Sequence, residues 1–265
     1  MVGKKLTVEK DILTTAAQAC VNSYNGRWGN ANNNLFNEQK VFYDAETRWY
    51  MGYNKKQQTA YIVFQGTVNK AGWENNFDYQ QVRFDGARGY IHKGFYRDEV
   101  EKVFPDVWKE LTKLYHETET RFNVVVCGHS KGASNALLCA AQLKAQDLPF
   151  VCEIKCVAFA PARVGSPVFA RTYKKLKIPT MIFKYGNDMV CKVPPPIAPG
   201  LIRRRWKFLW MNYWPTIQLW KHPVKVTHLG AKWYTWLLHC LPVVRFFGNP
   251  LDHKPQNYLK AVKNL

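Results

Sequence analysis

The hydrophobic positions of this chain fall into two kinds of run, short β-branched or aromatic stretches and longer stretches with helical spacing. The short runs predict strands near Trp49–Tyr53, Tyr61–Phe64, Asn123–Cys127, Ile154–Phe159 and Met181–Lys184. The longer runs predict helices near Val8–Ser23, Glu99–Glu117 and Lys131–Lys144, and a last helix after Pro255. Alternating strands and helices indicate an α/β fold, with a mostly parallel central sheet covered by helices on both faces.

No repeat, low-complexity tract or flexible linker divides the 265 residues, of which 47% are hydrophobic. We therefore expect one α/β domain over residues 1–265. The N-terminus mixes charged residues with short apolar steps and does not read as a signal peptide. The stretch that comes nearest to a membrane span, Trp233–Val244, is interrupted by His239 and Pro242, so no span is predicted.

A glycine-bracketed serine stands where a predicted strand ends and a predicted helix begins. The motif Gly128-His129-Ser130-Lys131-Gly132 follows a β-branched run and precedes an alanine-rich helical pattern. The glycines permit a turn too tight for side chains, and this turn lifts the serine hydroxyl above the sheet. Because the chain has only four serines, a chance match to the motif is rare. Ser130 is therefore the candidate nucleophile.

A serine nucleophile needs a base to take its proton and a carboxylate to orient that base. In a strand-turn-helix setting of this kind the chain order is serine, acid, histidine. Among the carboxylates after the elbow helix, Asp188 is the one that follows a strand through a glycine turn, Gly186-Asn187. Parallel strands bring their carboxyl ends to one edge of the sheet, so Asp188 is the candidate acid.

Four histidines follow Asp188. His239 lies in an apolar stretch and reads as a core histidine. His253 follows a Gly-Asn-Pro turn, a loop position that suits a general base. His228 competes with His253, and the spacing of the residues leaves the choice between them open.

Several motifs resemble those of the class 3 lipase family, the fungal-lipase-like branch of the α/β-hydrolases. Val63–Thr67 is similar to its oxyanion segment, His92–Phe95 matches its His-x-Gly-Phe, and Trp73 with Asn76 or Asp78 resembles its Trp-x-x-Asp. Ala158–Pro167 is similar to its Phe-Gly-x-Pro-Arg-Val-Gly block, and Asn187–Pro195 matches its Asp-x-Val segment with two prolines. Asp252-His253 with Tyr258 resembles the catalytic histidine segment, so the family favours His253 over His228.

The resemblance implies an α/β-hydrolase fold and a serine carboxylic-ester hydrolase, a lipase or esterase acting on acylglycerols or other lipid esters. Ser130 would attack the acyl carbonyl, His253 would move the proton, and Asp188 would orient His253. The amides of Thr67 and Lys131 would bind the oxyanion. No metal or cofactor is expected. The alternatives are a phospholipase A-type hydrolase on anionic lipid surfaces and a non-catalytic membrane-peripheral binding protein.

The chain departs from the family beside the nucleophile. Gln65 stands where the family usually has arginine, Lys131 replaces an apolar residue, and Ala133 replaces a common glycine. A backbone donor at Lys131 does not depend on its side chain. The Lys131 ammonium either attracts an anionic substrate group or points to solvent.

The chain carries 38 Lys and Arg against 19 Asp and Glu, a formal net charge of +19. No acidic residue lies between Asp188 and Asp252, and the stretch of about 198–225 reads as an insertion after the acid strand. Its cations are interleaved with tryptophans, as is typical of a lipid interface. An aromatic flap with a charged rim is the alternative, and a nucleic-acid surface is disfavoured because no such motif is visible. The candidate contacts with an anionic membrane surface are Arg203, Arg204, Arg205, Trp206, Lys207 and Trp210.

Seven cysteines, an odd number without Cys-x-x-Cys spacing, indicate neither a zinc site nor a disulfide framework. A reducing compartment suits such cysteines better. With no recognisable signal peptide, the sequence predicts a cytoplasmic protein that can bind the periphery of a membrane.

Overall fold

The computed structural model describes residues 7–24, 35–43, 48–67, 80–84, 86–203, 213–230 and 249–265. Within these residues the main sheet has seven strands in the order β1-β2-β3-β6-β7-β8-β11. Strands β1 to β3 are antiparallel, and every pair from β3 to β11 is parallel. The strands are β1 (Glu38–Tyr43), β2 (Arg48–Asn54), β3 (Thr59–Phe64), β6 (Phe122–His129), β7 (Val151–Phe159), β8 (Thr180–Tyr185) and β11 (Val226–Leu229).

All five strands predicted from the sequence belong to this sheet, and the expected mostly parallel α/β architecture is confirmed. Strands β1 and β11 were not predicted. Strand β11 has only four residues, and most of its positions are exposed or half-buried, so its hydrophobic pattern is weak.

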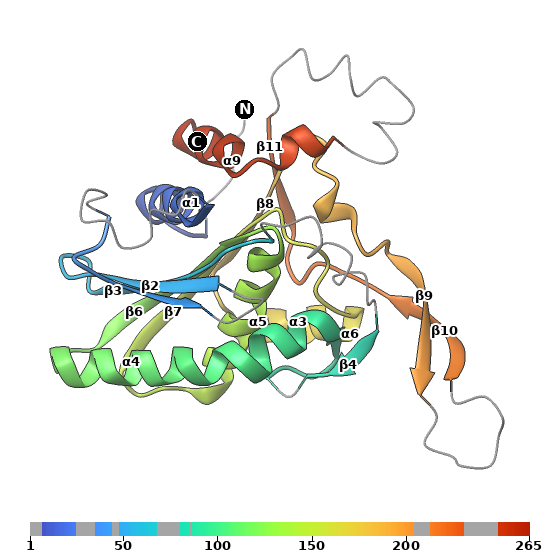
Figure 1. Ribbon diagram of the computed structural model, residues 1–265, viewed down its shortest axis with the longest axis horizontal. Coiled ribbons are helices and arrows are strands. Elements are labelled where there is room, and N and C mark those ends of the chain that lie inside the picture. Colours follow the sequence, from blue (N-terminus) through green and yellow to red (C-terminus); the bar gives the residue numbers. More distant parts are fainter. Residues whose placement is uncertain are drawn as a thin grey trace.

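Helices cover both faces of the sheet (Figure 1). Helices α1 (Lys10–Tyr24) and α9 (Pro255–Lys263) lie side by side on one face, whereas α4 (Phe104–Thr118), α5 (Lys131–Gln146) and α6 (Pro167–Lys175) cover the other. Central strand β6 shows why, because successive side chains of a strand point to opposite faces. Val124 and Val126 pack in the core under α5, while Val125 and Cys127 pack in the core under α1.

The predicted helix near Glu99–Glu117 is divided in the structure. A π-helical segment, Tyr96–Val103, follows the short helix α3 (Lys93–Phe95) and leads into α4. Pro105 lies in the first turn of α4. Proline has no amide hydrogen to continue the ladder of the preceding turn, but it is well tolerated in the first turn of a new helix.

Two antiparallel ribbons flank the main sheet. One pairs β4 (Gln81–Arg83) with β5 (Tyr90–His92), and the other pairs β9 (Ile197–Arg203) with β10 (Tyr213–Leu219). The strands of the β9–β10 ribbon lie almost entirely in the predicted insertion, and the ribbon projects away from the helices (Figure 1). Two 3₁₀ turns complete the described elements, η3 (Val190–Lys192) and η4 (Pro250–His253). None of the helices in the described ranges combines the length and the apolar character that a membrane crossing requires.

Candidate active site

Ser130 occupies a sharp turn between β6 and α5. Its backbone angles, φ 61° and ψ −129°, lie outside the regions that L-residues usually adopt, at a cost of roughly 1–3 kcal/mol. The Ser130 amide donates to the Phe159 carbonyl of β7, and the Ser130 carbonyl accepts from Ala133 in the first turn of α5. The neighbouring strand and the helix therefore hold the strained residue from both sides.

The two glycines of the motif are needed for close approach. A Cβ on Gly128 would collide with the backbone of Gly132, and a Cβ on Gly132 would collide with the backbone of Phe64 and Gln65. Any side chain at either position would push α5 away from the end of β3 or β6. The steric reason inferred from the sequence for these glycines is thus found in the structure.

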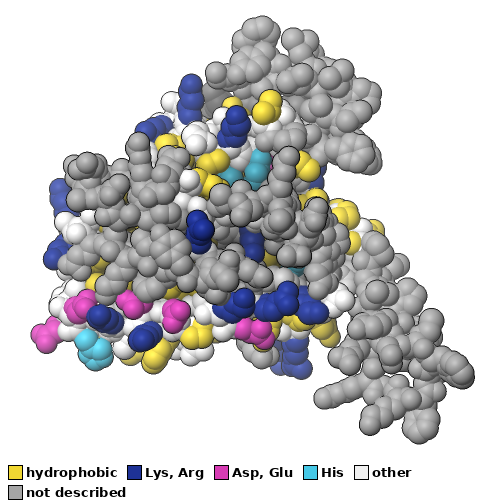
Figure 2. Space-filling model, viewed as in Figure 1, with side chains coloured by type: hydrophobic (Ala, Val, Ile, Leu, Met, Phe, Trp, Pro, Cys, Tyr) yellow, Lys and Arg dark blue, Asp and Glu magenta, His cyan; other side chains and the backbone are white. Residues whose placement is uncertain are grey.

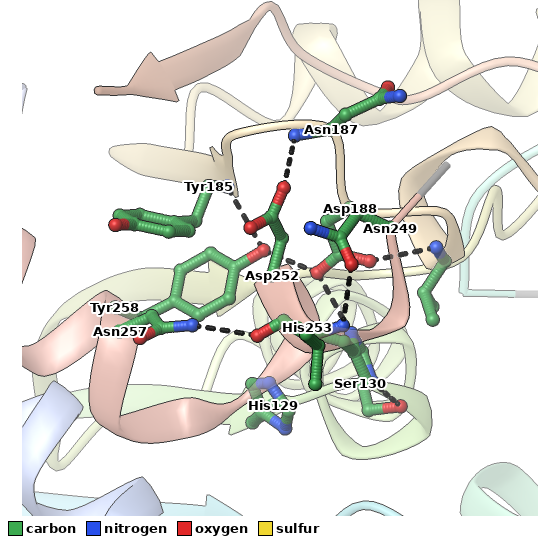
Figure 3. A network of polar contacts seen from close by, with 12 residues as sticks. His129, Ser130, Tyr185, Asn187, Asp188, Asn249, Asp252, His253, Asn257 and Tyr258 are labelled. Carbon is green, nitrogen blue, oxygen red and sulfur yellow. Dashed lines mark hydrogen bonds and ion pairs between the residues drawn. The ribbon is translucent and has the colours of Figure 1, made fainter. Parts of the chain in front are cut away.

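Ser130, His253 and Asp188 lie in a hydrogen-bonded row (Figure 3). His253 Nε2 is 2.9 Å from Ser130 Oγ, and His253 Nδ1 is 2.8 Å from Asp188 Oδ2. A carboxylate only accepts hydrogen bonds, so Nδ1 carries the proton and Nε2 is left to accept from the serine. This tautomer is the one in which an imidazole can remove the hydroxyl proton.

Asp188 is completely buried and its carboxylate has several donors. Its Oδ1 accepts from the Val190 amide at 2.8 Å, and its Oδ2 accepts from the Tyr258 hydroxyl at 2.5 Å as well as from His253. The Tyr258 oxygen in turn accepts from the Tyr185 amide at 3.0 Å. Burial, followed by the charge of Asp188, raises the pKa of Tyr258 well above its usual value, so the hydroxyl remains a donor.

The structure brings His253, not His228, to the serine. His228 lies on β11, where it is exposed and paired in register with Lys184 of β8. His239, which the sequence indicates to be a core histidine, lies outside the described residues.

Two further residues, Tyr24 and His129, lie next to the triad and were not singled out from the sequence. The Tyr24 hydroxyl and His129 Nδ1 share a hydrogen bond of 2.9 Å, and the His129 ring lies 4.6 Å from the His253 ring. Burial, and after it the charge on His253, lowers the pKa of His129 well below its usual value. His253 therefore packs against a neutral imidazole. The only sequence signal for this role was the place of His129 next to Ser130.

The backbone segments that carry the predicted oxyanion residues, Thr67 and Lys131, both border Ser130. Gly66, which precedes Thr67, runs so close that a Cβ there would touch the Ser130 Cβ, and Lys131 is the first residue of α5. The side chain of Gln65 donates to the Ser23 carbonyl at 2.5 Å and so ties this segment to the end of α1. Gln65, an exception to the family pattern, thus has a structural role of its own.

The predicted membrane contacts are largely beyond the described ranges. Arg203 is the last residue of β9, where only the backbone is described, while Arg204, Arg205, Trp206, Lys207 and Trp210 lie outside the described residues, as do Trp73, Asn76 and Asp78. At the base of the ribbon Trp220 is buried, and its ring lies 5.7 Å from that of His92. The insertion is therefore anchored in the core at this end.

In the part of the chain that the structure describes, no group of three or more His, Cys, Asp or Glu side chains is arranged to hold a metal ion.

A serine on a strand-to-helix turn, joined through histidine to an aspartate at the carboxyl edge of a mostly parallel sheet, defines an α/β-hydrolase. Residues 61–197 match the family model described as lipase (class 3), and the chain belongs to this family. The match also confirms the resemblance found in the sequence.

Individual relatives agree with this assignment. A lipase of Rhizopus niveus is 34% identical over 161 residues, which cover 57% of this chain and 38% of the lipase. The chloroplastic phospholipase A1 PLIP2 of Arabidopsis thaliana is 28% identical over 93 residues, 34% of this chain and 12% of that protein. The structure of lipase II from Rhizopus niveus aligns with a TM-score of 0.61 at 23% identity and covers 92% of both chains. The present chain thus spans well under half the length of these curated relatives, while its fold matches 92% of a solved lipase chain.

Proposed function

We propose that this protein is a serine carboxylic-ester hydrolase, a lipase or esterase that acts on acylglycerols or other lipid esters. One observation carries the proposal: His253 bridges Ser130 Oγ and Asp188 Oδ2 with hydrogen bonds of 2.9 and 2.8 Å. Membership of the class 3 lipase family supports the choice of a lipid ester as the substrate.

The geometry supports a two-step reaction. Ser130 Oγ attacks the acyl carbonyl carbon while its proton passes to His253 Nε2, and the resulting imidazolium is stabilised by Asp188. The proton then moves to the leaving alkoxide, which departs as the alcohol and leaves an acyl-serine. Water repeats the sequence with His253 as base and releases the carboxylic acid and free Ser130.

The developing negative charge on the carbonyl oxygen needs fixed donors. We assign this role to the amides of Thr67 and Lys131, because both backbone segments border Ser130. The Lys131 amide also belongs to the N-terminus of α5, where the helix dipole favours negative charge.

A phospholipase A-type activity is the second candidate, favoured by a group of cations around the segment that follows β8. The Arg163 guanidinium donates to the carbonyls of Lys192 and Pro194. Burial, and after it the charge of Lys184, lowers the pKa of Lys192, which indicates that Lys184 and Lys192 lie within electrostatic range of each other. Such cations suit a lipid phosphate, and one of the similar proteins is named a phospholipase A1.

We also propose that the protein works at an anionic membrane surface in a reducing, cytoplasmic compartment. The basic and aromatic composition of residues 203–220 supports the surface. The exposed Cys152, which forms no disulfide, supports the compartment.

The decisive experiment combines labelling with an activity profile. The protein and its Ser130→Ala variant are treated with a fluorophosphonate probe, then assayed on p-nitrophenyl esters, triacylglycerol emulsions and anionic phospholipid vesicles. The proposal requires an adduct on Ser130 and ester turnover that both disappear in the variant. A folded protein without adduct and without turnover would instead be a non-catalytic membrane-peripheral binding protein. Preferential turnover of phospholipid would select the second candidate.

A further inference from the structure

The bond between His253 and Asp188 joins two turns that are 65 residues apart in the chain. Asp188 lies in the acid turn, residues 186–190, and His253 lies in the base turn, residues 249–254. Chain connectivity alone does not fix the distance between two such turns. Further contacts between the two turns must therefore keep Asp188 and His253 within hydrogen-bonding distance.

The backbone N–H and C=O of Asn187 are both bound by the base turn, and the bond to Asp252 is drawn in Figure 3. The Asn187 amide donates to Asp252 Oδ2 at 2.8 Å, and the Asn187 carbonyl accepts from the Asn249 amide at 2.9 Å. Asn187 immediately precedes Asp188, and Asp252 immediately precedes His253. The hydrogen bond between residues 187 and 252 is thus a second link between the two turns, directly beside the catalytic hydrogen bond between residues 188 and 253.

Asp252 is only 2% exposed. Burying a carboxylate costs free energy unless hydrogen-bond donors compensate it. The base turn is itself closed locally, because the Asp252 amide donates to the Asn249 carbonyl and the Asn249 side chain accepts from the Leu251 amide. The base turn therefore has its own hydrogen bonds, and these direct the Asp252 side chain towards the acid turn.

We propose that Asp252 is a positioning residue for the triad, whose carboxylate locks the acid turn to the base turn so that Asp188 keeps His253 aimed at Ser130. Without the Asp252 carboxylate, the two turns would be joined by the His253–Asp188 hydrogen bond and by the backbone bond from Asn249 to Asn187. The carboxylate adds a side-chain hydrogen bond directly beside the catalytic one and so limits rotation of His253 relative to Asp188. The inference rests on the proposed ester hydrolysis, since positioning has a catalytic meaning only if the triad turns over substrate.

The test compares Asp252→Ala with Asp252→Asn, which keeps an oxygen acceptor for the Asn187 amide, and with Asn257→Ala as a matched control. Asn257 donates to the Leu251 carbonyl of the base turn at 2.9 Å, so its side chain is held within this half of the chain and not by the acid turn. We expect Asp252→Ala to lower kcat by about ten- to a hundredfold with KM within about twofold, because small misplacements of catalytic groups have effects of this size. Asp252→Asn should restore most of the loss, and Asn257→Ala should leave kcat unchanged.

A spectroscopic readout separates positioning from general stability. The far-downfield proton resonance of His253 Nδ1–H should be present in wild type, Asp252→Asn and Asn257→Ala, and lost or broadened in Asp252→Ala at a temperature where all are folded. If Asp252→Ala does not fold, Asp252→Ser, which is too short to reach Asn187, takes its place in both measurements. Unchanged kcat and resonance in a folded Ala or Ser variant would overturn the proposal, and so would an Asn variant as impaired as the Ala variant. An inactive wild type without an adduct on Ser130 would defeat the proposed hydrolysis instead, while the resonance would still report on the two turns.

Discussion

The hydroxyl of Tyr258 and the ring of His253 donate to the same oxygen, Asp188 Oδ2, at 2.5 and 2.8 Å. Tyr258 comes from α9 and stands in the buried core next to Val262, so a residue of the last helix shares the acid with the catalytic base.

Replacing Tyr258 with Phe tests this sharing. The change leaves Asp188 without one donor and the Tyr185 amide without its acceptor. Loss of a buried hydrogen bond to a charged group costs about 1.5–3 kcal/mol, so we expect kcat to fall by about tenfold or more and the protein to be less stable. Steady-state kinetics and thermal unfolding measure the two effects. Wild-type kcat in the variant would show that Asp188 does not depend on Tyr258.

Replacing Ser130 with Ala should reduce ester turnover by at least about a thousandfold, as removal of a nucleophile generally does. The fold should survive because the turn depends on Gly128 and Gly132 rather than on the hydroxyl. Circular dichroism and thermal unfolding serve as the control. Substantial turnover without a labelled serine would contradict the assignment.

The choice of base is tested by two single variants. His253→Ala should lower turnover by about a thousandfold or more. His228→Ala should leave turnover close to wild type, with at most a small change in stability, because His228 is exposed on β11. The reverse outcome, an inactive but folded His228 variant and an active His253 variant, would show that His228 on β11 is the general base.

The half-buried His222 predicts a pH dependence of stability. Its Nε2 is 3.0 Å from the Cys191 carbonyl. Burial, together with the nearby cations Arg163 and Lys184, lowers the pKa of His222 from 6.5 to about 4, although the hydrogen bond to the Cys191 carbonyl acts in the opposite direction. Well above pH 6.5 the ring is neutral in both the folded and the unfolded protein, and its contribution is constant. As the pH falls towards 4, His222 becomes protonated in the unfolded chain but stays neutral in the folded protein. The free energy of unfolding therefore decreases, by roughly 3 kcal/mol at most.

His222→Gln keeps a donor for the Cys191 carbonyl but cannot titrate. Urea unfolding of both proteins between pH 4 and 7 should therefore show a flatter decline for the variant. Parallel curves for the two proteins would mean that His222 titrates normally in the folded state.

The basic stretch is tested by changing Arg203, Arg204, Arg205 and Lys207 to Gln together. At an anionic surface each cation contributes roughly 1 kcal/mol, so vesicle binding should weaken by a few kcal/mol, most visibly at low salt. Turnover of a short soluble ester should hardly change, because these residues have no part in the proton transfers. Unchanged co-sedimentation with anionic vesicles would remove the membrane role and leave the triad untouched.

The local parts of the site were predictable from the sequence. The elbow around Ser130 depends on two glycines and on a strand and helix adjacent in the chain, and Asp188 depends on one strand end and one turn. These signals act within a few residues, where backbone sterics and hydrophobic spacing are readable. His253 was predicted through family resemblance, and the structure places it between Ser130 and Asp188.

The long-range parts were not predictable. Nothing near Tyr24 in the sequence points to His129, 105 residues away, and nothing near Asp252 points to the amide of Asn187. Such contacts depend on how α1 and η4 pack on the sheet, which is a property of the whole core. Helix α6 was a different kind of omission, because Ser166 followed by proline is a readable start: its side chain caps the Phe169 amide.

Helix α1 ends in Ser23 and Tyr24. Ser23 binds Gln65 of the predicted oxyanion segment, and Tyr24 binds His129 beside the nucleophile. A shortened chain that began after Tyr24 would still contain Ser130, Asp188 and His253. It would lack the partner of the oxyanion segment and the residue that holds the imidazole below His253. A split-protein reporter or a circular permutant must therefore keep helix α1, either in the same chain or as a separate peptide. Without α1 the site around Ser130 is incomplete.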